Sequence, residues 1–256
     1  FGDAPSAEII PLEVMVEREP ITVLCSAKGW VRAMKGHVED TDPDKFKEAK
    51  YKEGDRGKFE LKAETTDKLL IFATNGKFYT IGCDKLPGGR GFGEPIRLWI
   101  DLGNEHEIVT MMVYKPGQKL LVAGHDGRGF IVPADEVVAQ TKNGRQVLSL
   151  PEGVEAVVAT PLPEGGDMLA VVGENRKLLI FPVSEVPEMN RGRGVTLQKY
   201  KDGGLSDARV YVKREGLTWR LGEKTRTETD LKLWIGQRAQ AGRLPPNGFP
   251  KNNKFG

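Results

Sequence analysis

The stretch KLLIFATNGKFYTIG (Lys68–Gly82) consists of two apolar runs on either side of the dipeptide Asn75-Gly76. Both runs are rich in residues that favour strands. Asn-Gly accepts the positive φ angles that a two-residue turn between antiparallel strands requires. Together these features predict a β-hairpin.

The same pattern of apolar run, polar turn, basic residue and second apolar run recurs along the chain. Aligned on their turns, successive copies are 47, 51, 49 and 40 residues apart, and the last copy is the weakest match. We therefore predict five hairpins, near residues 21–36, 68–82, 119–133, 168–182 and 208–222.

Further strand-like runs lie between the hairpins, for example Phe59–Ala63, Ile108–Tyr114 and Ala156–Leu162. They bring each unit to roughly four strands in about 45–50 residues, which is typical of a propeller. We predict an all-β fold: a single domain over residues 1–256, built from five four-stranded units arranged radially. A chain of hairpins in two sandwiches is the alternative, which the regular spacing disfavours.

The fourth turn differs from the others, because Arg176 stands where the other copies carry Gly29, Gly76, Gly127 and Gly216. Residues with a side chain rarely adopt a positive φ angle. We expect this turn either to be built differently or to be strained.

Composition excludes several classes of protein. The chain of 256 residues has 31 Gly and 16 Pro and is 39% hydrophobic, and no apolar run approaches the roughly 20 residues of a membrane-spanning helix. Its first residues lack the pattern of a secretory signal. Cys25 and Cys83 cannot form a disulfide framework and have no zinc-ligand spacing, which favours a reducing compartment such as the cytoplasm.

Charge is unevenly distributed along the chain. Residues 190–256 contain 15 Lys+Arg and 6 Asp+Glu, a balance of +9, which leaves −7 for residues 1–189 because the total is +2. A basic last quarter suggests a polyanionic partner on one side of the molecule. An ordinary solvated surface with unevenly spread lysines is an equally good reading of charge alone.

Signals of catalysis are weak. His37, His106 and His125 are not spaced as metal ligands or as a general base with its partner. The string GGRGFGEP (Gly88–Pro95) contains Pro95 and precedes a strand-like run, so it does not place phosphate at a helix N-terminus. We predict no catalytic residue and no metal site.

Basic, glycine-rich connectors between hairpins are the remaining candidates for function. They are GGRGFGEP at 88–95, TKNGRQ at 141–146, NRGRG at 190–194 and GQRAQAGR at 236–243. Together with basic residues near the hairpins, they predict sequence-independent binding to a DNA duplex backbone, whereas loops that serve only turns and solubility are the alternative. The predicted contacts are Lys28, Arg32, Lys77, Arg90, Arg128, Lys142, Arg145, Lys177, Arg191, Arg193, Arg220, Arg238 and Arg243.

A family resemblance rests on these hairpins and connectors. The hairpin ends IGCDKLP, IVPADEV and IFPVSEV, with GGRGFGEP and NRGRG, resemble the C-terminal domain of the ParC subunit of topoisomerase IV and its gyrase A relative over essentially the whole chain. The resemblance implies a β-pinwheel, a propeller-like disc whose blades exchange a strand. It implies five blades in a closed or an open ring, with double-stranded DNA bent around a basic rim.

The resemblance also implies a role and partners. The domain would help a type II topoisomerase select among DNA topologies and would carry no cofactor. Cleavage, ATP and Mg²⁺ would belong to the rest of the enzyme. Its partners would be the ATPase subunit, the N-terminal part of its own subunit and protein regulators, in the cytoplasm at the nucleoid.

Two departures and one alternative qualify this reading. The box Gln-Arg-Arg-Gly-Gly-Lys-Gly of gyrase is absent, which disfavours a gyrase-type wrapping domain. None of the five tyrosines has the Arg-Tyr-Thr context of the catalytic residue. A propeller-type scaffold for protein interactions is the alternative function.

Overall fold

The structure, a computed structural model, describes residues 17–37 and 50–256. These residues fall into two compact units. Unit 1 comprises the described residues up to Leu70 with Thr80–Asp101 and Met111–Tyr114, and unit 2 comprises Ile71–Tyr79, Leu102–Thr110 and Lys115–Gly256. In the described part of the chain, no helix has the length and apolar character needed to cross a membrane.

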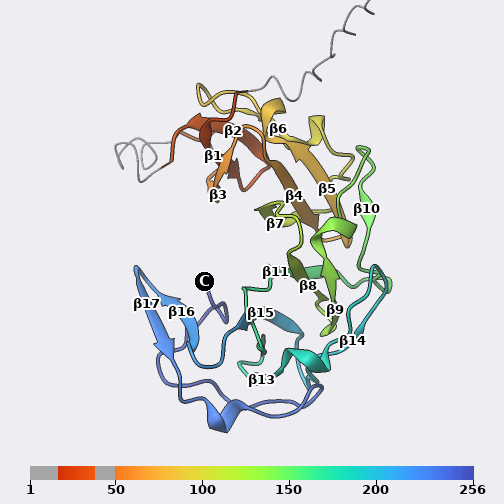
Figure 1. Cartoon of the computed structure of the whole chain (residues 1–256), viewed down its shortest axis with the longest axis vertical. Coiled ribbons are helices and arrows are strands. Elements are labelled where there is room, and N and C mark those ends of the chain that lie inside the picture. The colour runs from red at the N-terminus through yellow and green to blue at the C-terminus, as the bar shows by residue number, and fades with distance from the viewer. Residues whose placement is uncertain (1–16, 38–49) are drawn as a thin grey trace, which may run out of the picture. The chain divides into compact units, whose positions relative to one another are not determined.

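The first sheet contains four antiparallel strands in the order β3-β1-β2-β6 (Figure 1). Its strands are β1 (Pro20–Ser26), β2 (Trp30–Lys35), β3 (Gly57–Glu64) and β6 (Glu94–Pro95). The central strand β1 is buried from Ile21 to Ser26, because it has a neighbour on each side and both of its faces are covered. This is why the sequence of β1 is a nearly continuous apolar run and does not alternate between apolar and polar residues.

The second and third sheets repeat this order. The second is β10-β5-β4-β7 and the third is β11-β8-β9-β14. Their strands are β4 (Lys68–Ala73), β5 (Lys77–Gly82), β7 (Ile108–Val113) and β10 (Arg145–Gln146), then β8 (Lys119–Gly124), β9 (Arg128–Pro133), β11 (Ala156–Pro161) and β14 (Val195–Thr196). The prediction of an all-β fold made of repeated four-stranded antiparallel sheets is confirmed.

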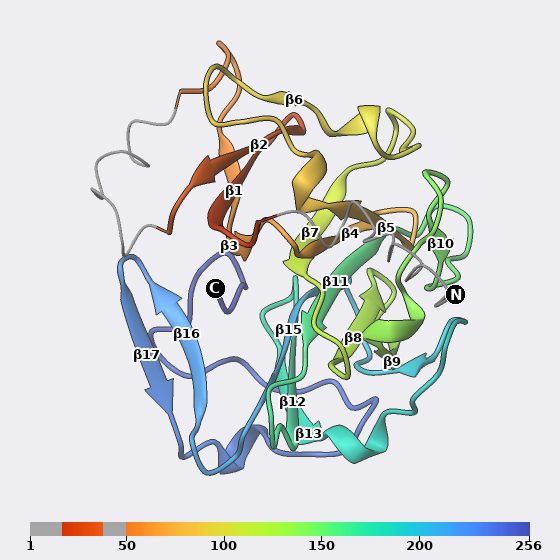
Figure 2. The same cartoon turned by 45° about the horizontal axis from the view of Figure 1, so that its top comes forward.

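The last two sheets are smaller. The fourth has the order β13-β12-β15, which Figure 2 shows side by side, and the fifth is the hairpin β16-β17. Their strands are β12 (Met168–Gly173), β13 (Leu178–Pro182), β15 (Leu205–Tyr211), β16 (Leu217–Leu221) and β17 (Lys224–Glu228). Short 3₁₀ helices join strands at η3 (Cys83–Lys85), η4 (Ile96–Leu98), η5 (Ala134–Glu136), η6 (Val183–Glu185) and η7 (Lys232–Trp234).

The predicted fifth hairpin is wrong. β15 pairs with β12 of the fourth sheet, from Leu205↔Gly173 to Tyr211↔Met168, and not with β16. The hairpin in this region is β16 with β17, which turns at Gly222 with φ 64°. β15 therefore pairs with the edge of β12 that β13 leaves unpaired. A local sequence pattern cannot distinguish this long-range pairing from pairing with the next strand.

All five predicted turn positions have a positive φ angle. Gly29, Gly76, Gly127 and Gly216 have φ between 80° and 94°, and Arg176 has φ 65°. The fourth turn therefore has the same local conformation as the others, and Arg176 carries the strain that a Cβ brings to the left-handed region.

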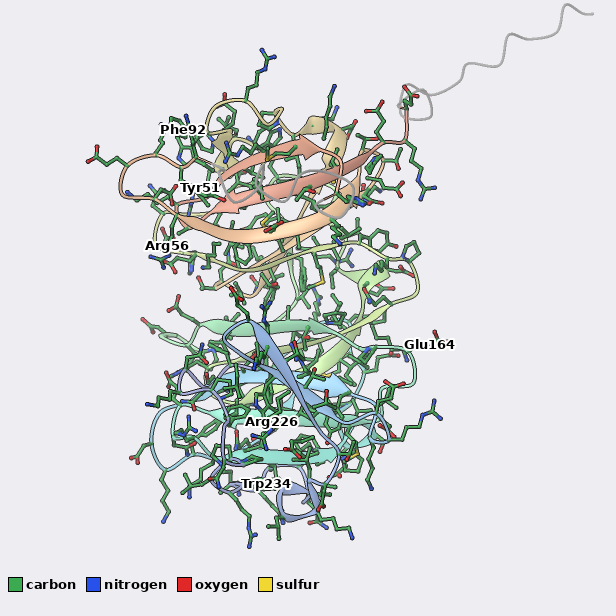
Figure 3. The ribbon with its side chains drawn as sticks, turned by 90° about the vertical axis from the view of Figure 1, so that its left-hand side faces the viewer. Tyr51, Arg56, Phe92, Glu164, Arg226 and Trp234 are labelled. Carbon is green, nitrogen blue, oxygen red and sulfur yellow. The ribbon has the colours of Figure 1, made fainter. Side chains whose placement is uncertain are left out.

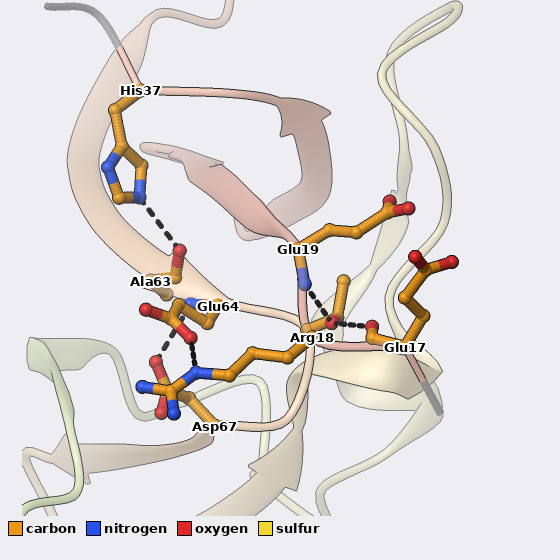
Figure 4. A network of polar contacts seen from close by, with 8 residues as sticks. Glu17, Arg18, Glu19, His37, Ala63, Glu64 and Asp67 are labelled. Carbon is orange, nitrogen blue, oxygen red and sulfur yellow. Dashed lines mark hydrogen bonds and ion pairs between the residues drawn. The ribbon is translucent and has the colours of Figure 1, made fainter. Parts of the chain in front are cut away.

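A polar network joins the start of the first strand to the end of its neighbour (Figure 4). The guanidinium of Arg18 forms an ion pair with Glu64 at the end of β3. The backbone N–H of Glu19 donates to Oγ1 of Thr65 at 3.0 Å, and the N–H of Glu64 donates to Asp67 at 2.8 Å. These contacts fix where β1 begins against β3.

The C-terminal segment completes the core around the fifth sheet. Phe249 and Phe255 pack edge-to-face, with ring centroids 5.5 Å apart, and Phe249 makes a similar contact with Trp219 of β16. The N–H of Arg220 donates to the carbonyl of Phe255 at 2.9 Å, so this segment lies beside β16. Burial of three aromatic rings makes the segment part of the fold.

Candidate nucleic-acid interface

The glycine-rich connectors are the segments that exchange strands between sheets. β6, β10 and β14 each follow a later hairpin in the chain, yet each pairs with the second strand of the preceding hairpin. The fourth connector does the same through a bridge between Arg243 and Leu178 of β13. Strand exchange of this kind is what the resemblance implies.

One glycine in each connector packs against the backbone of the preceding hairpin. A Cβ at any of these positions would lie closer than 3.0 Å to a carbonyl oxygen of the neighbouring strand. The four pairs are Gly93 with Val31, Gly144 with Phe78, Gly194 with Gly129, and Gly242 with Leu178. Strand packing therefore requires these glycines, and it gives the four connectors the same register on their hairpins.

Several predicted phosphate contacts instead hold the exchanged strands. Nζ of Lys77 donates to the carbonyl of Asn143 at 3.3 Å, and Nη2 of Arg128 donates to Gly194 at 2.7 Å. Both residues begin the second strand of a hairpin, so they act at equivalent places.

Arg32 corrects the prediction. Its side chain is only 4% exposed, and its guanidinium donates to the carbonyls of Gly91 and Lys50. A buried guanidinium engaged in this way cannot reach a phosphate. Nη1 of Arg238 is likewise engaged, with the carbonyl of Thr196 at 2.9 Å, and Lys177 is half-buried.

Among the predicted contacts, the exposed cations lie mainly on the connectors. In unit 2, exposed cations flank the packed glycine of successive connectors. They are Lys142 and Arg145 around Gly144, Arg191 and Arg193 before Gly194, and Arg243 after Gly242. Two of them form ion pairs at the limit of the distance range, Arg145 with Glu136 at 4.0 Å and Arg193 with Asp126 at 3.9 Å.

Other exposed cations lie outside this arrangement. In unit 1, Arg90 is on the first connector and Lys28 is next to the first turn. Arg220 is exposed on β16, away from any connector. Arg214 and Lys213 lie beside Glu164 and Asp167. These two acidic residues precede β12, whereas Arg176 follows the other end of that strand.

Sequence reasoning missed an aromatic residue in this region. Phe92 is 42% exposed on the first connector, on the same side of unit 1 as Tyr51 in Figure 3. Nearby, Nζ of Lys52 lies 3.7 Å from the ring centroid of Trp30. The signal that could have identified it is the single aromatic residue within GGRGFGEP. One such residue hardly changes the aromatic content of the connectors taken together.

The thiols have no place in this interface. Cys25 and Cys83 are free and buried, and burial raises the pKa of each to about 12. Both thiols are therefore protonated at neutral pH and pack as small apolar groups. No group of His, Cys, Asp and Glu within residues 17–37 and 50–256 is arranged to hold a metal ion.

Repeated sheets with exchanged strands define a β-propeller family. Residues 67–115, 118–160 and 167–210 match the model of the DNA gyrase C-terminal domain, beta-propeller, and the chain belongs to that family. The three matched segments correspond to the repeats β4–β7, β8–β11 and β12–β15.

Within that family the chain is similar to the ParC subunit of topoisomerase IV. It is 44% identical to the Rickettsia bellii protein over 97% of this chain and 45% identical to the Caulobacter vibrioides protein over 100% of it. In both comparisons the chain spans about a third of the relative's length (33%). The resemblance seen in the sequence is confirmed.

Solved structures agree with this assignment. The Escherichia coli ParC C-terminal domain has a TM-score of 0.75 and 28% identity, covering 91% of this chain and 96% of that one. The DNA gyrase A C-terminal domain, at 18% identity and a TM-score of 0.65, shares the fold; the match covers 92% of this chain and 80% of that one.

Proposed function

We propose that this chain is the DNA-binding and DNA-bending domain of a type II topoisomerase of the topoisomerase IV class. The observation that carries the proposal is the recurrence of exposed cations beside the packed glycine of successive connectors in unit 2. Each connector has the same register on its hairpin, so every repeat in unit 2 carries an exposed cation within three residues of an equivalently placed glycine.

The chemistry of these side chains suits a duplex backbone. Arg and Lys neutralise phosphates and release counterions, and they bind without reading base sequence. Cations on successive connectors can contact phosphates over several turns of the duplex only if the DNA bends toward them. Bending costs elastic energy, and the additional phosphate contacts offset that cost.

The rest of the activity lies elsewhere in this proposal. Strand cleavage, ATP and Mg²⁺ belong to the ATPase subunit of the enzyme and to the remaining two thirds of the ParC polypeptide, which are the expected protein partners. The domain then contributes by selecting which DNA geometry reaches the catalytic part.

A pair of double variants tests the role of the connectors. Arg191→Ala with Arg193→Ala removes two exposed connector cations, and Lys213→Ala with Arg214→Ala removes two exposed cations outside the connectors. The first variant should weaken duplex binding and lower the salt slope by about two, because each phosphate-contacting cation contributes about one. The second should bind almost as the unmodified protein does.

Equal effects of the two double variants would count against the proposal. They would mean that affinity follows net charge rather than the connectors. Thermal unfolding of both variants controls for folding, since all four side chains are exposed.

A further inference from the structure

Phe92 is a partly exposed aromatic residue on the first connector. It lies between Gly91 and Gly93, which have φ angles of 75° and 82°. Its ring is 42% exposed, and Figure 3 shows it at the surface of unit 1. An aromatic ring at this level of exposure offers a large apolar surface for contact with a partner.

A hydrogen bond from the buried side chain of Arg32 holds the loop that carries Phe92. The buried guanidinium of Arg32 donates to the carbonyl of Gly91, directly before Phe92, and to that of Lys50 at 2.8 Å. The same group lies 5.5 Å from the ring centroid of Tyr51. A backbone held in this way is preorganised, and little conformational freedom is left to lose on binding.

Charged side chains flank Phe92. Arg90 is exposed two residues earlier and Glu94 two residues later, and Lys52 lies over Trp30 on β2, the strand that Arg32 also occupies. An exposed apolar side chain next to phosphate-binding cations is the arrangement of proteins that wedge a residue between base pairs. The equivalent position before the packed glycine carries Asn143, Arg193 and Ala241 in the other connectors, so a large apolar group occurs in the first connector alone.

We propose that Phe92 inserts between adjacent base pairs of bound duplex DNA and kinks it, with Arg90 on a neighbouring phosphate. This inference rests on the proposed DNA binding by the connectors and adds to it a fixed kink point. An inserted wedge must unstack one base step. A wedge therefore binds more readily where base stacking is already interrupted. In DNA with a single-nucleotide gap, part of the unstacking cost is absent.

The test compares an intact duplex with the same duplex carrying one single-nucleotide gap, titrated with the full 256-residue chain. The unmodified protein should bind the gapped DNA about tenfold more tightly, which corresponds to about 1.4 kcal/mol. Phe92→Ala should reduce this ratio to about one while keeping most of the affinity for intact duplex, and Phe92→Leu should keep most of the preference.

Leu98→Ala is the matched control. Leu98 is 55% exposed on η4, just after the same connector, and its removal should leave the ratio unchanged. Equal binding of both DNAs by the unmodified protein, or a preference that survives in Phe92→Ala, would overturn the wedge and leave cation binding intact. Failure to bind either DNA would instead refute the proposed function on which the wedge rests.

Discussion

The guanidinium of Arg176 donates hydrogen bonds to the carbonyl of Pro250 at 2.9 Å and to Oδ1 of Asn253 at 3.1 Å. A residue in the turn of the fourth hairpin thereby holds the C-terminal segment, which packs Phe249 and Phe255 into the core. The left-handed backbone of Arg176 costs about 1 kcal/mol relative to glycine, and these hydrogen bonds offset it.

Two substitutions separate the backbone of Arg176 from its side chain. Arg176→Gly relieves the strain but loses hydrogen bonds worth about 1 kcal/mol each, so it should lower the free energy of unfolding modestly. Arg176→Ala loses the same bonds and keeps the strain, and should be less stable than Arg176→Gly by about 1 kcal/mol. Denaturant unfolding measures both, and an Ala variant as stable as the Gly variant would contradict this account.

Packing of the connector glycines can be tested at Gly194. Gly194→Ala places a Cβ against the carbonyl of Gly129, so β14 must move and stability should fall by several kcal/mol, in the range of about 1–3 for overpacking plus about 1 for the positive φ angle. Gly153→Ala is the control, because Gly153 also has a positive φ angle (79°) but nothing lies within 4 Å of its added Cβ.

For this pair, unfolding in denaturant should show a much larger loss for Gly194→Ala than for Gly153→Ala. Losses of the same size would mean that only backbone conformation, and not contact between strands, requires these glycines.

Asp207, which binds the C-terminal segment, makes the stability of the protein depend on pH. Its carboxylate accepts hydrogen bonds from the N–H groups of Phe255 and Ala208, both at 2.9 Å. Burial raises the pKa of Asp207 above its ordinary value of 3.8 despite these bonds. The folded protein therefore binds this proton more tightly than the unfolded chain does.

The sign of the pH effect follows from that shift. The stability that protonated Asp207 contributes is fully present below pH 3.8 and is lost as pH rises through the raised pKa. Asp207→Asn does not titrate, so the stability of the variant relative to the unmodified protein should rise between acidic and neutral pH. Unfolding free energies of both proteins across this range test the prediction, and a constant or falling difference would contradict it.

Much of the fold could be predicted because its signals are local. Asn75-Gly76 and Asp126-Gly127 each mark a turn between apolar runs, and the structure has hairpins at both places. The fifth repeat could not be placed in this way. Leu205–Tyr211 has the composition of a hairpin strand, and only long-range pairing with β12 assigns it to the fourth sheet.

The candidate interface was predictable in part. The connectors were found from their glycines and cations. Strands of two residues such as β6 and β10 leave no periodic signal, so only the family resemblance, and not the local pattern, indicated their exchange between sheets. Arg32 reads as an ordinary basic residue after the turn. It is buried because the first connector crosses over it, a contact between residues 59 positions apart.

The salt dependence of duplex binding tests the central claim most directly. Six exposed cations lie on the connectors, Arg90, Lys142, Arg145, Arg191, Arg193 and Arg243, and each that contacts a phosphate should contribute about −0.9 to the slope of log K against log salt. The account predicts a slope between about −4 and −5.4, with affinities that barely change between unrelated duplex sequences. A slope near zero, or binding to one sequence alone, would contradict it.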